Sequence, residues 1–134
     1  MGHRLSDWEQ RLSDYLISKR HEPFQYGKHD CAHFVAGAVE AITGENPMAD
    51  IAREYNSEIS SLRVLKELGF DNVEQFTDSK FTSILVAFAQ TGDIALHDGS
   101  LGIVISSKAV FASEIGYTFV DRSEWSNAWE VGRG

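Results

Sequence analysis

Cys31 is the only cysteine of this chain, and it directly follows Asp30 at the end of a short loop. A lone thiol cannot form an internal disulfide, so it can pack, bind a metal or act as a nucleophile. Apolar residues at helical spacing follow it, namely Val35, Val39 and Ile42. We therefore expect Asp30 to cap a helix that begins at Cys31, where unpaired N–H groups and the helix dipole stabilise a thiolate. Core packing is an equally good interpretation, because Cys31 also begins the apolar stripe.

A thiol nucleophile needs a general base, and His97 is the best candidate among the histidines. It ends an expected strand, where a shift of one residue decides whether the imidazole points toward Cys31 or away from it. A solvated histidine beside a turn is the competing interpretation. His29 and His33 flank the cysteine but are poorer bases. His33 points to a different side of the helix, and His29 is expected at a turn or on the surface.

The same residues could be considered as a zinc site, with His29, Cys31 and His33 joined by His97. Structural zinc usually takes four nitrogen or sulfur ligands, commonly from paired cysteines, and this chain has no such pair. We therefore expect no metal and no cofactor. Gly92-Asp93 is expected to be a structural turn in which the aspartate caps backbone N–H groups.

The elements that would position these residues begin with helices. The first is expected over Leu5–Lys19, with Ser6 and Glu9 as a capping box. A short helical turn is expected around Met48 to Arg53. Another helix should run from Ser57 to a stop at Gly69, with a buried edge formed by Ile59, Leu62, Leu65 and Leu68.

From Phe81 onward, short β-branched and aromatic segments alternate with turn signals. We expect strands at Ile84–Phe88, Ile94–Leu96, Leu101–Ile105, Val110–Ala112 and Tyr117–Val120, with Asn127–Val131 as a final edge strand. Short connections favour antiparallel hairpins. The prediction is one α+β domain over residues 1–134, with N-terminal helices packed on a C-terminal antiparallel sheet. Trp125 and Trp129 are expected in the core.

The composition of the chain limits the kinds of partner that we expect it to bind. The chain is 43% apolar and carries a net charge of −8, so a folded protein is expected and nucleic acid is not. No apolar run is long enough for a membrane span. The N-terminal residues lack the apolar stretch of a signal peptide, so we expect synthesis in the cytoplasm without export through such a signal.

Four ordered motifs carry a family resemblance. They are Tyr26-Gly27 with Asp30-Cys31, then Thr43-Gly44-Glu45-Asn46-Pro47, then Gly92-Asp93-Ile94, then Ser100-Leu101-Gly102-Ile103, and Trp129 lies near the C-terminus. Their order resembles the NlpC-type, papain-like cell-wall cysteine peptidases, and more narrowly the small phage-tail proteins related to them. The resemblance implies a papain-like fold with Cys31 as nucleophile. It also implies that Tyr26 and the backbone at Cys31 would help to bind an oxyanion.

The sequence departs from the peptidase pattern at the other catalytic positions. The peptidases place their base histidine where this chain has Ser100, and their orienting polar residue falls here on an apolar stretch around Phe111 and Ala112. Serine cannot accept a proton from a thiol near neutral pH, which leaves His97 as a displaced base. The resemblance thus implies a degenerate tail-tip component that serves in phage or prophage tail assembly. The alternative is an active peptidoglycan hydrolase that helps the tail to penetrate the cell wall.

The same resemblance implies partners and a location. The partners would be tail-hub or tail-tip proteins of the virion, with peptidoglycan as a possible further ligand. The protein would be made in the cytoplasm of the bacterial host and then become part of the virion tail.

Overall fold

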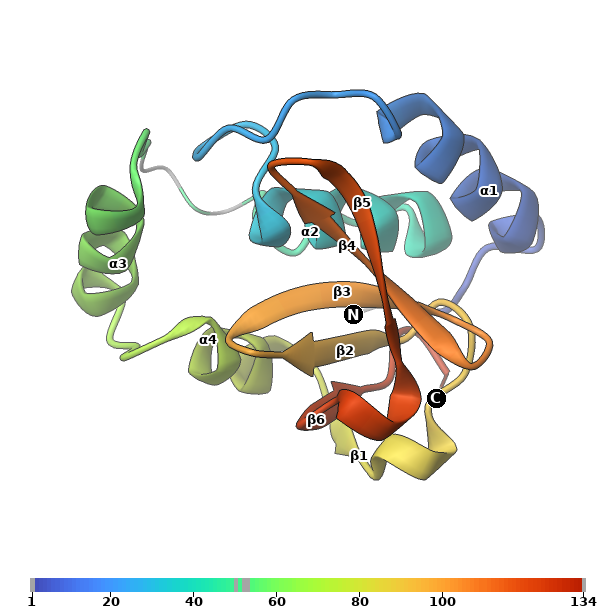
Figure 1. Ribbon diagram of the computed structural model, residues 1–134. Coiled ribbons are helices and arrows are strands. Elements are labelled where there is room, and N and C mark those ends of the chain that lie inside the picture. The colour runs from blue at the N-terminus through green and yellow to red at the C-terminus, as the bar shows by residue number, and fades with distance from the viewer. Residues whose placement is uncertain (1, 50, 52–53, 134) are drawn as a thin grey trace.

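The structure is a computed structural model that describes residues 2–49, 51 and 54–133. Over these residues it is an α+β protein with an antiparallel six-stranded sheet in the order β1-β6-β2-β3-β4-β5 (Figure 1). The helices are α1 Trp8–Lys19, α2 Cys31–Thr43, α3 Glu58–Glu67 and α4 Val73–Lys80. The strands are β1 Ser83–Ile84, β2 Ile94–His97, β3 Ser100–Ile105, β4 Lys108–Ser113, β5 Gly116–Asp121 and β6 Asn127–Trp129, with 3-10 turns η1 Val86–Phe88 and η2 Arg122–Glu124.

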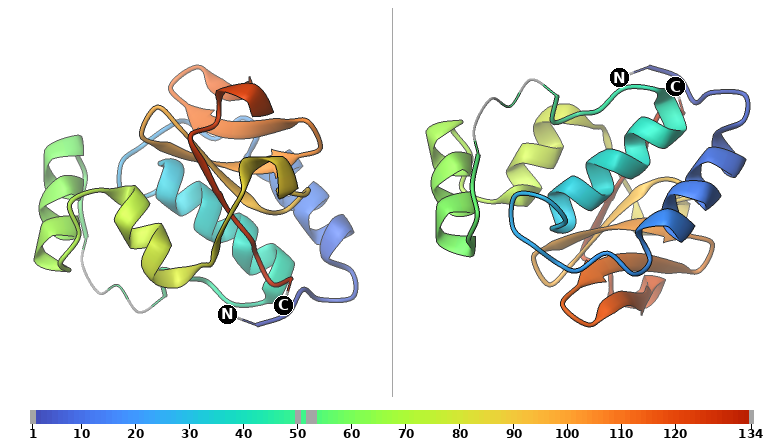
Figure 2. Two further views of the ribbon diagram at one scale, coloured as in Figure 1. Left: turned by 90° about the horizontal axis from the view of Figure 1, so that it is seen from below. Right: turned by 90° about the horizontal axis from the view of Figure 1, so that it is seen from above.

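Helix α2 begins at Cys31 with Asp30 as its cap, as predicted. The Asp30 side chain accepts the backbone N–H of His33 at 2.8 Å, and Gly44 closes the helix in the left-handed region with φ 83°. The helix packs on one face of the sheet, with α1 beside it (Figure 2).

Helix α1 begins later than predicted. Asp7 precedes it without a side-chain cap, so the expected start at Leu5 and the capping box of Ser6 and Glu9 are both wrong. The reason is tertiary, because the Leu5 N–H donates to the carbonyl of Ile42 at 2.8 Å. That bond holds Leu5 against the end of α2 and outside the helix.

Helix α3 has the predicted caps but not the predicted burial. Ser57 and Ser60 form its capping box, and Gly69 follows its end at φ +95°. None of its residues is buried, and the exposed fractions of Ile59 and Leu62 are 73% and 45%. Figure 1 shows α3 standing apart from the sheet. The predicted buried edge is therefore wrong. Of the helical turn expected around Met48 to Arg53, residues 50, 52 and 53 lie outside the described residues.

The predicted strands fall in the right places with two differences, and one helix is additional. The segment expected as Ile84–Phe88 is strand only at β1 and then forms η1. Helix α4 was not expected. Strand β6 is no edge strand, because it pairs with β1 on one side and β2 on the other.

The sheet buries side chains on both faces. The face under α1 and α2 carries Ile94, Leu96, Leu101, Ile103, Val110 and Trp129. The opposite face carries Ala95, Val104, Ala109, Phe111, Val120 and Trp125. The prediction that both C-terminal tryptophans belong to the core is confirmed, although they lie on opposite faces.

Asp93 joins the two ends of the described chain. Its side chain is fully buried and accepts the backbone N–H of Gln90 at 2.8 Å, as the turn prediction required. It also forms ion pairs with Arg4 at 3.0 Å and Arg133 at 2.7 Å, which the sequence did not indicate. The two termini consequently lie close together (Figure 2).

Candidate functional site

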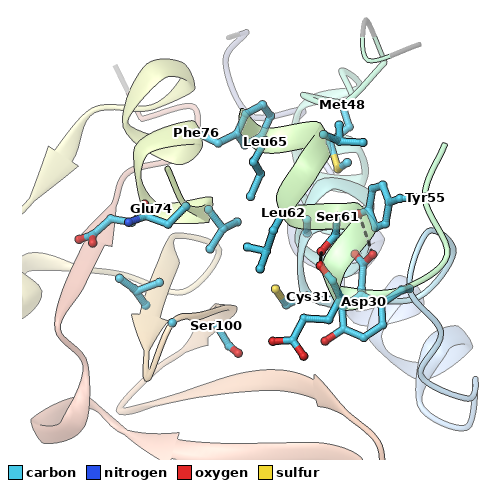
Figure 3. A pocket seen from close by; sticks show the side chains of 18 of the residues that line it. Asp30, Cys31, Met48, Tyr55, Ser61, Leu62, Leu65, Glu74, Phe76 and Ser100 are labelled. Carbon is cyan, nitrogen blue, oxygen red and sulfur yellow. Dashed lines mark hydrogen bonds between the residues drawn. The ribbon is translucent and has the colours of Figure 1, made fainter. Parts of the chain in front are cut away.

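A pocket of about 720 Å³ opens where the N-terminal end of α2 meets α3, α4 and the β2–β3 hairpin. We call it the Cys31 groove. Cys31 lies in the first turn of α2, and its sulfur points into the groove (Figure 3). A size of this order is typical of pockets that hold a small ligand or a few side chains of a partner.

The loop before Cys31 is shaped by one glycine. Gly27 has φ +85°, and a Cβ at this position would collide with the backbone carbonyl of Tyr55. Its N–H donates to Asp30 Oδ2 at 2.9 Å. The Tyr26-Gly27 pair is therefore explained by the close passage of a distant segment over the loop.

Asp30 is the centre of a hydrogen-bonded network at the rim of the groove. Besides Gly27 and the His33 N–H, it accepts the Tyr55 hydroxyl at 2.7 Å, and its Oδ1 lies 2.9 Å from His33 Nδ1. Burial raises the pKa of this carboxyl, but the hydrogen bonds from His33, Gly27 and Tyr55 outweigh it and bring the pKa to about 2. Asp30 is therefore an anion at neutral pH, and it fixes the start of α2.

The Cys31 thiol has no such activation. Burial raises its pKa, and this effect outweighs hydrogen bonds from the backbone of Leu101, Ala32 and Cys31 itself, which lower it. The hydrogen bond from Leu101 places the sulfur next to strand β3. A thiol with a raised pKa is protonated at neutral pH and is a poor nucleophile.

His97 lies on the wrong face of the sheet to serve as a base. Its ring packs edge-on against Phe111, with centroids 6.1 Å apart, and Phe111 belongs to the core of the face opposite α2. Its Nδ1 donates to the carbonyl of Glu124 at 2.9 Å. The hypothesis of His97 as a displaced base is therefore wrong, and strand alternation is the physical reason.

The positions that match the peptidase base and its orienting residue do border the site. Ser100 and Ala112 line the Cys31 groove. Phe111 lies on the other face, where it covers Gly102 so closely that a Cβ there would come within 2.7 Å of its ring. The groove therefore meets a hydroxyl and a methyl group where the peptidases have their imidazole and polar partner.

Tyr26, the oxyanion candidate, also lines the groove. Burial raises the pKa of its hydroxyl, and the negative charges of Glu58 and Asp30 raise it further. A phenol with a raised pKa keeps its proton and remains a hydrogen-bond donor at neutral pH.

The histidines that flank Cys31 are engaged elsewhere. His29 closes a turn, because its N–H donates to the carbonyl of Gln25 at 2.8 Å, so the expected turn position holds, but the residue is buried and not on the surface. Its Nδ1 lies 3.1 Å from Glu22 Oε2, and burial lowers its pKa. His33 faces Asp30 and Tyr55. Across the described residues, no group of three or more His, Cys, Asp or Glu side chains could hold a metal ion.

Two parts of the site escaped the sequence analysis. Tyr55 belongs to no motif, and only the fold brings it to Asp30. Helix α4 did leave a signal, since Asn72 caps it by accepting the N–H of Gln75, and an Asn followed three residues later by Gln is typical of a helix start.

Comparison with protein families gives a match that covers nearly the whole chain. A protein-family model described as "Domain of unknown function (DUF6950)" matches residues 3–131. No curated protein matches the chain. Within the described parts of the chain, no helix has the length and apolar character required to cross a membrane.

Proposed function

Because the chain belongs to the DUF6950 family, a family of unknown function, we propose a function from the chain's own site. The protein is a degenerate, NlpC-like domain of papain-like architecture. It serves as a structural or assembly component of a phage or prophage tail tip, and its partners are tail-hub or tail-tip proteins.

The architecture supports the first part of this proposal. The helix that begins at Cys31 packs against strand β3 of an antiparallel sheet. The loop before it follows the aromatic-Gly-x-x-Asp-Cys pattern, and Ser100 begins a strand that reads Ser-Leu-Gly-Ile. This is the arrangement that the resemblance to the NlpC-type peptidases implies. A fold does not by itself fix an activity, so the chemistry has to be argued from the site.

The observation that carries the loss of activity is the state of the Cys31 thiol. Its pKa is raised by burial, the matching base position is Ser100, and His97 lies on the opposite face of the sheet. Thiol peptidases depend on an imidazole that takes the proton and then donates it to the leaving group. With no imidazole among the described residues that line the Cys31 groove, neither transfer has a residue to perform it.

An active peptidoglycan hydrolase remains the second candidate, because one feature favours it. Backbone groups of Leu101, Ala32 and Cys31 stabilise negative charge at the sulfur. The same feature is expected in a domain that keeps a buried, hydrogen-bonded thiol for packing.

The test has two arms. Assembled particles are fractionated, and the protein is sought at fixed stoichiometry with the tail-hub components. The purified domain and its Cys31→Ser variant are then incubated with cell walls. We expect the protein in particles and equal, background release of wall fragments by both forms. Free protein that never joins particles yet digests walls through Cys31 would defeat the proposal.

A further inference from the structure

The Cys31 groove has an apolar lining that α3 leaves uncovered. Leu62 and Leu65 of α3 and its C-cap residue Leu68 line it at one-turn spacing, and Leu96 and Ala112 of the sheet line it as well. Figure 3 shows Leu62 and Leu65 in the lining. Leu62 remains 45% exposed. Ile59 lies on the same helix but does not line the groove. A leucine row of this kind is typical of a surface that packs against a partner.

The charges that border this lining all have one sign. Among the described residues, every charged side chain that lines the groove is acidic: Asp30, Glu58, Glu74 and Asp98. The oxygens of Asp30 are taken up by its own hydrogen bonds, whereas Glu58 and Asp98 are exposed. Glu114 adds a further negative charge close to Tyr26, whose pKa it helps to raise.

We propose that the Cys31 groove binds a segment of a partner protein that is apolar in its middle and carries Lys or Arg at its ends. The apolar side chains in the middle of the partner segment pack against Leu62, Leu65 and Leu68. The cationic ends pair with Glu58 and Asp98 at the rim. This inference rests on the proposed function, since a component of an assembly must hold another protein.

Electrostatics argues against an acidic occupant. A carboxylate-rich ligand would meet only like charge at the described rim, in a chain whose net charge is −8. Charge complementarity of this kind selects partners and speeds their association, while the apolar centre supplies the affinity.

Cys31 offers a built-in reporter, because an occupant of the groove shields its sulfur from a small reagent. The probes are two capped heptapeptides with the same leucine and phenylalanine centre. One has a lysine at each end, and the other has a glutamate at each end. Alkylation of Cys31 by neutral iodoacetamide is followed by mass spectrometry at rising peptide concentration, and affinity is measured by calorimetry. We expect the lysine peptide to protect Cys31 at a concentration about tenfold lower than the glutamate peptide.

Matched variants locate the binding. Leu62→Asp should abolish protection, whereas Ile59→Asp, on the same helix but outside the groove, should leave it unchanged. Glu58→Gln with Asp98→Asn should remove the preference for lysine. Glu124→Gln with Asp121→Asn changes the charge equally at exposed positions that do not line the groove, and should keep the preference. Asparagine tolerates the positive φ of position 98, which limits the cost to folding.

The outcomes separate this inference from the proposed function. Equal affinity for the two peptides, no binding of either, or binding unaffected by Leu62→Asp overturns the inference. In each of those cases the proposed function still stands if the domain is inactive on cell walls. Wall digestion through Cys31 together with an intact lysine preference would overturn the proposed function and uphold the occupant proposed for the groove.

Discussion

The Tyr55 hydroxyl donates a hydrogen bond of 2.7 Å to Asp30 Oδ2 across 25 positions of sequence. This contact ties the segment that leads into α3 to the cap of α2, the helix that carries the thiol. Because Tyr55 and Asp30 both line the Cys31 groove, the network that stabilises the helix start also shapes the rim of the site.

Asp30→Asn should weaken the dependence of the free energy of unfolding on pH in the acidic range. The pKa of Asp30 is depressed to about 2 in the folded state, so its contribution is present above the unfolded pKa near 4 and is lost as pH falls toward 2. We expect the fall in the free energy of unfolding between pH 5 and pH 2 to shrink by about 2 kcal/mol in the variant. Urea denaturation at several pH values measures this. An unchanged pH slope would show that Asp30 is not the group responsible.

Asp93→Asn should destabilise the fold far more than removal of an exposed carboxylate. It leaves Arg4 and Arg133, which are mostly buried, without their shared counter-charge. We expect a loss of about 3–5 kcal/mol in the free energy of unfolding. The control is Asp121→Asn, which breaks an exposed pair with Lys108 and should cost under about 1 kcal/mol. Similar losses for the two variants would contradict the ion-pair argument.

Native Cys31 should be alkylated slowly at neutral pH. Burial raises the pKa of its thiol, so the rate should reach half of its maximum above pH ~8.5, the ordinary midpoint. The protein unfolded in urea, with its thiol solvated, is the internal control and should react faster at pH 7. A fast-reacting thiolate that persists below about pH 6 would refute this prediction and restore the activated nucleophile.

Ser100→His should bring an imidazole into the Cys31 groove and raise the reactivity of the thiol. Ser100 lines the groove but pairs with His97 in the β2–β3 register and shares its face of the sheet, so the variant tests whether the longer imidazole reaches the sulfur from the end of the hairpin. We expect alkylation at pH 7 to rise about tenfold, since an imidazolium partner stabilises the thiolate. Ser126→His, from another exposed position in the lining, is the matched control. If both variants react like the parent, the alignment of the Ser100 strand with the peptidase strand is wrong.

Helix α2 and the β2–β3 hairpin could be predicted from the sequence. Asp30 and Gly44 bound α2 through local capping, and the Asp98-Gly99 turn sets the β2–β3 pair through two positive φ values. Capping and turn chemistry depend on a few adjacent residues, which is why these elements were predictable.

The wrong predictions concern residues whose positions depend on contacts with residues far away in the sequence. Leu5 leaves the helix pattern because Ile42 accepts its N–H, and His97 faces away from Cys31 because the strand register places it over Phe111. Helical spacing on α3 predicted an apolar face correctly, but spacing does not say whether a layer exists for that face to cover. No described element packs over the apolar face of α3, so that face lines the open Cys31 groove.

The position of β6 between β1 and β2 has a consequence for biosynthesis. The order of strands in space differs from their order in the chain, so β1 gains its sheet partner only through the residues around Ala128. During translation, β2 to β5 can form hairpins with their neighbours as they emerge, whereas β1 must wait until the far strand has been made. The β1 edge of the sheet therefore stays incomplete until β6 has been made, and insertion of β6 between β1 and β2 is the step that completes it.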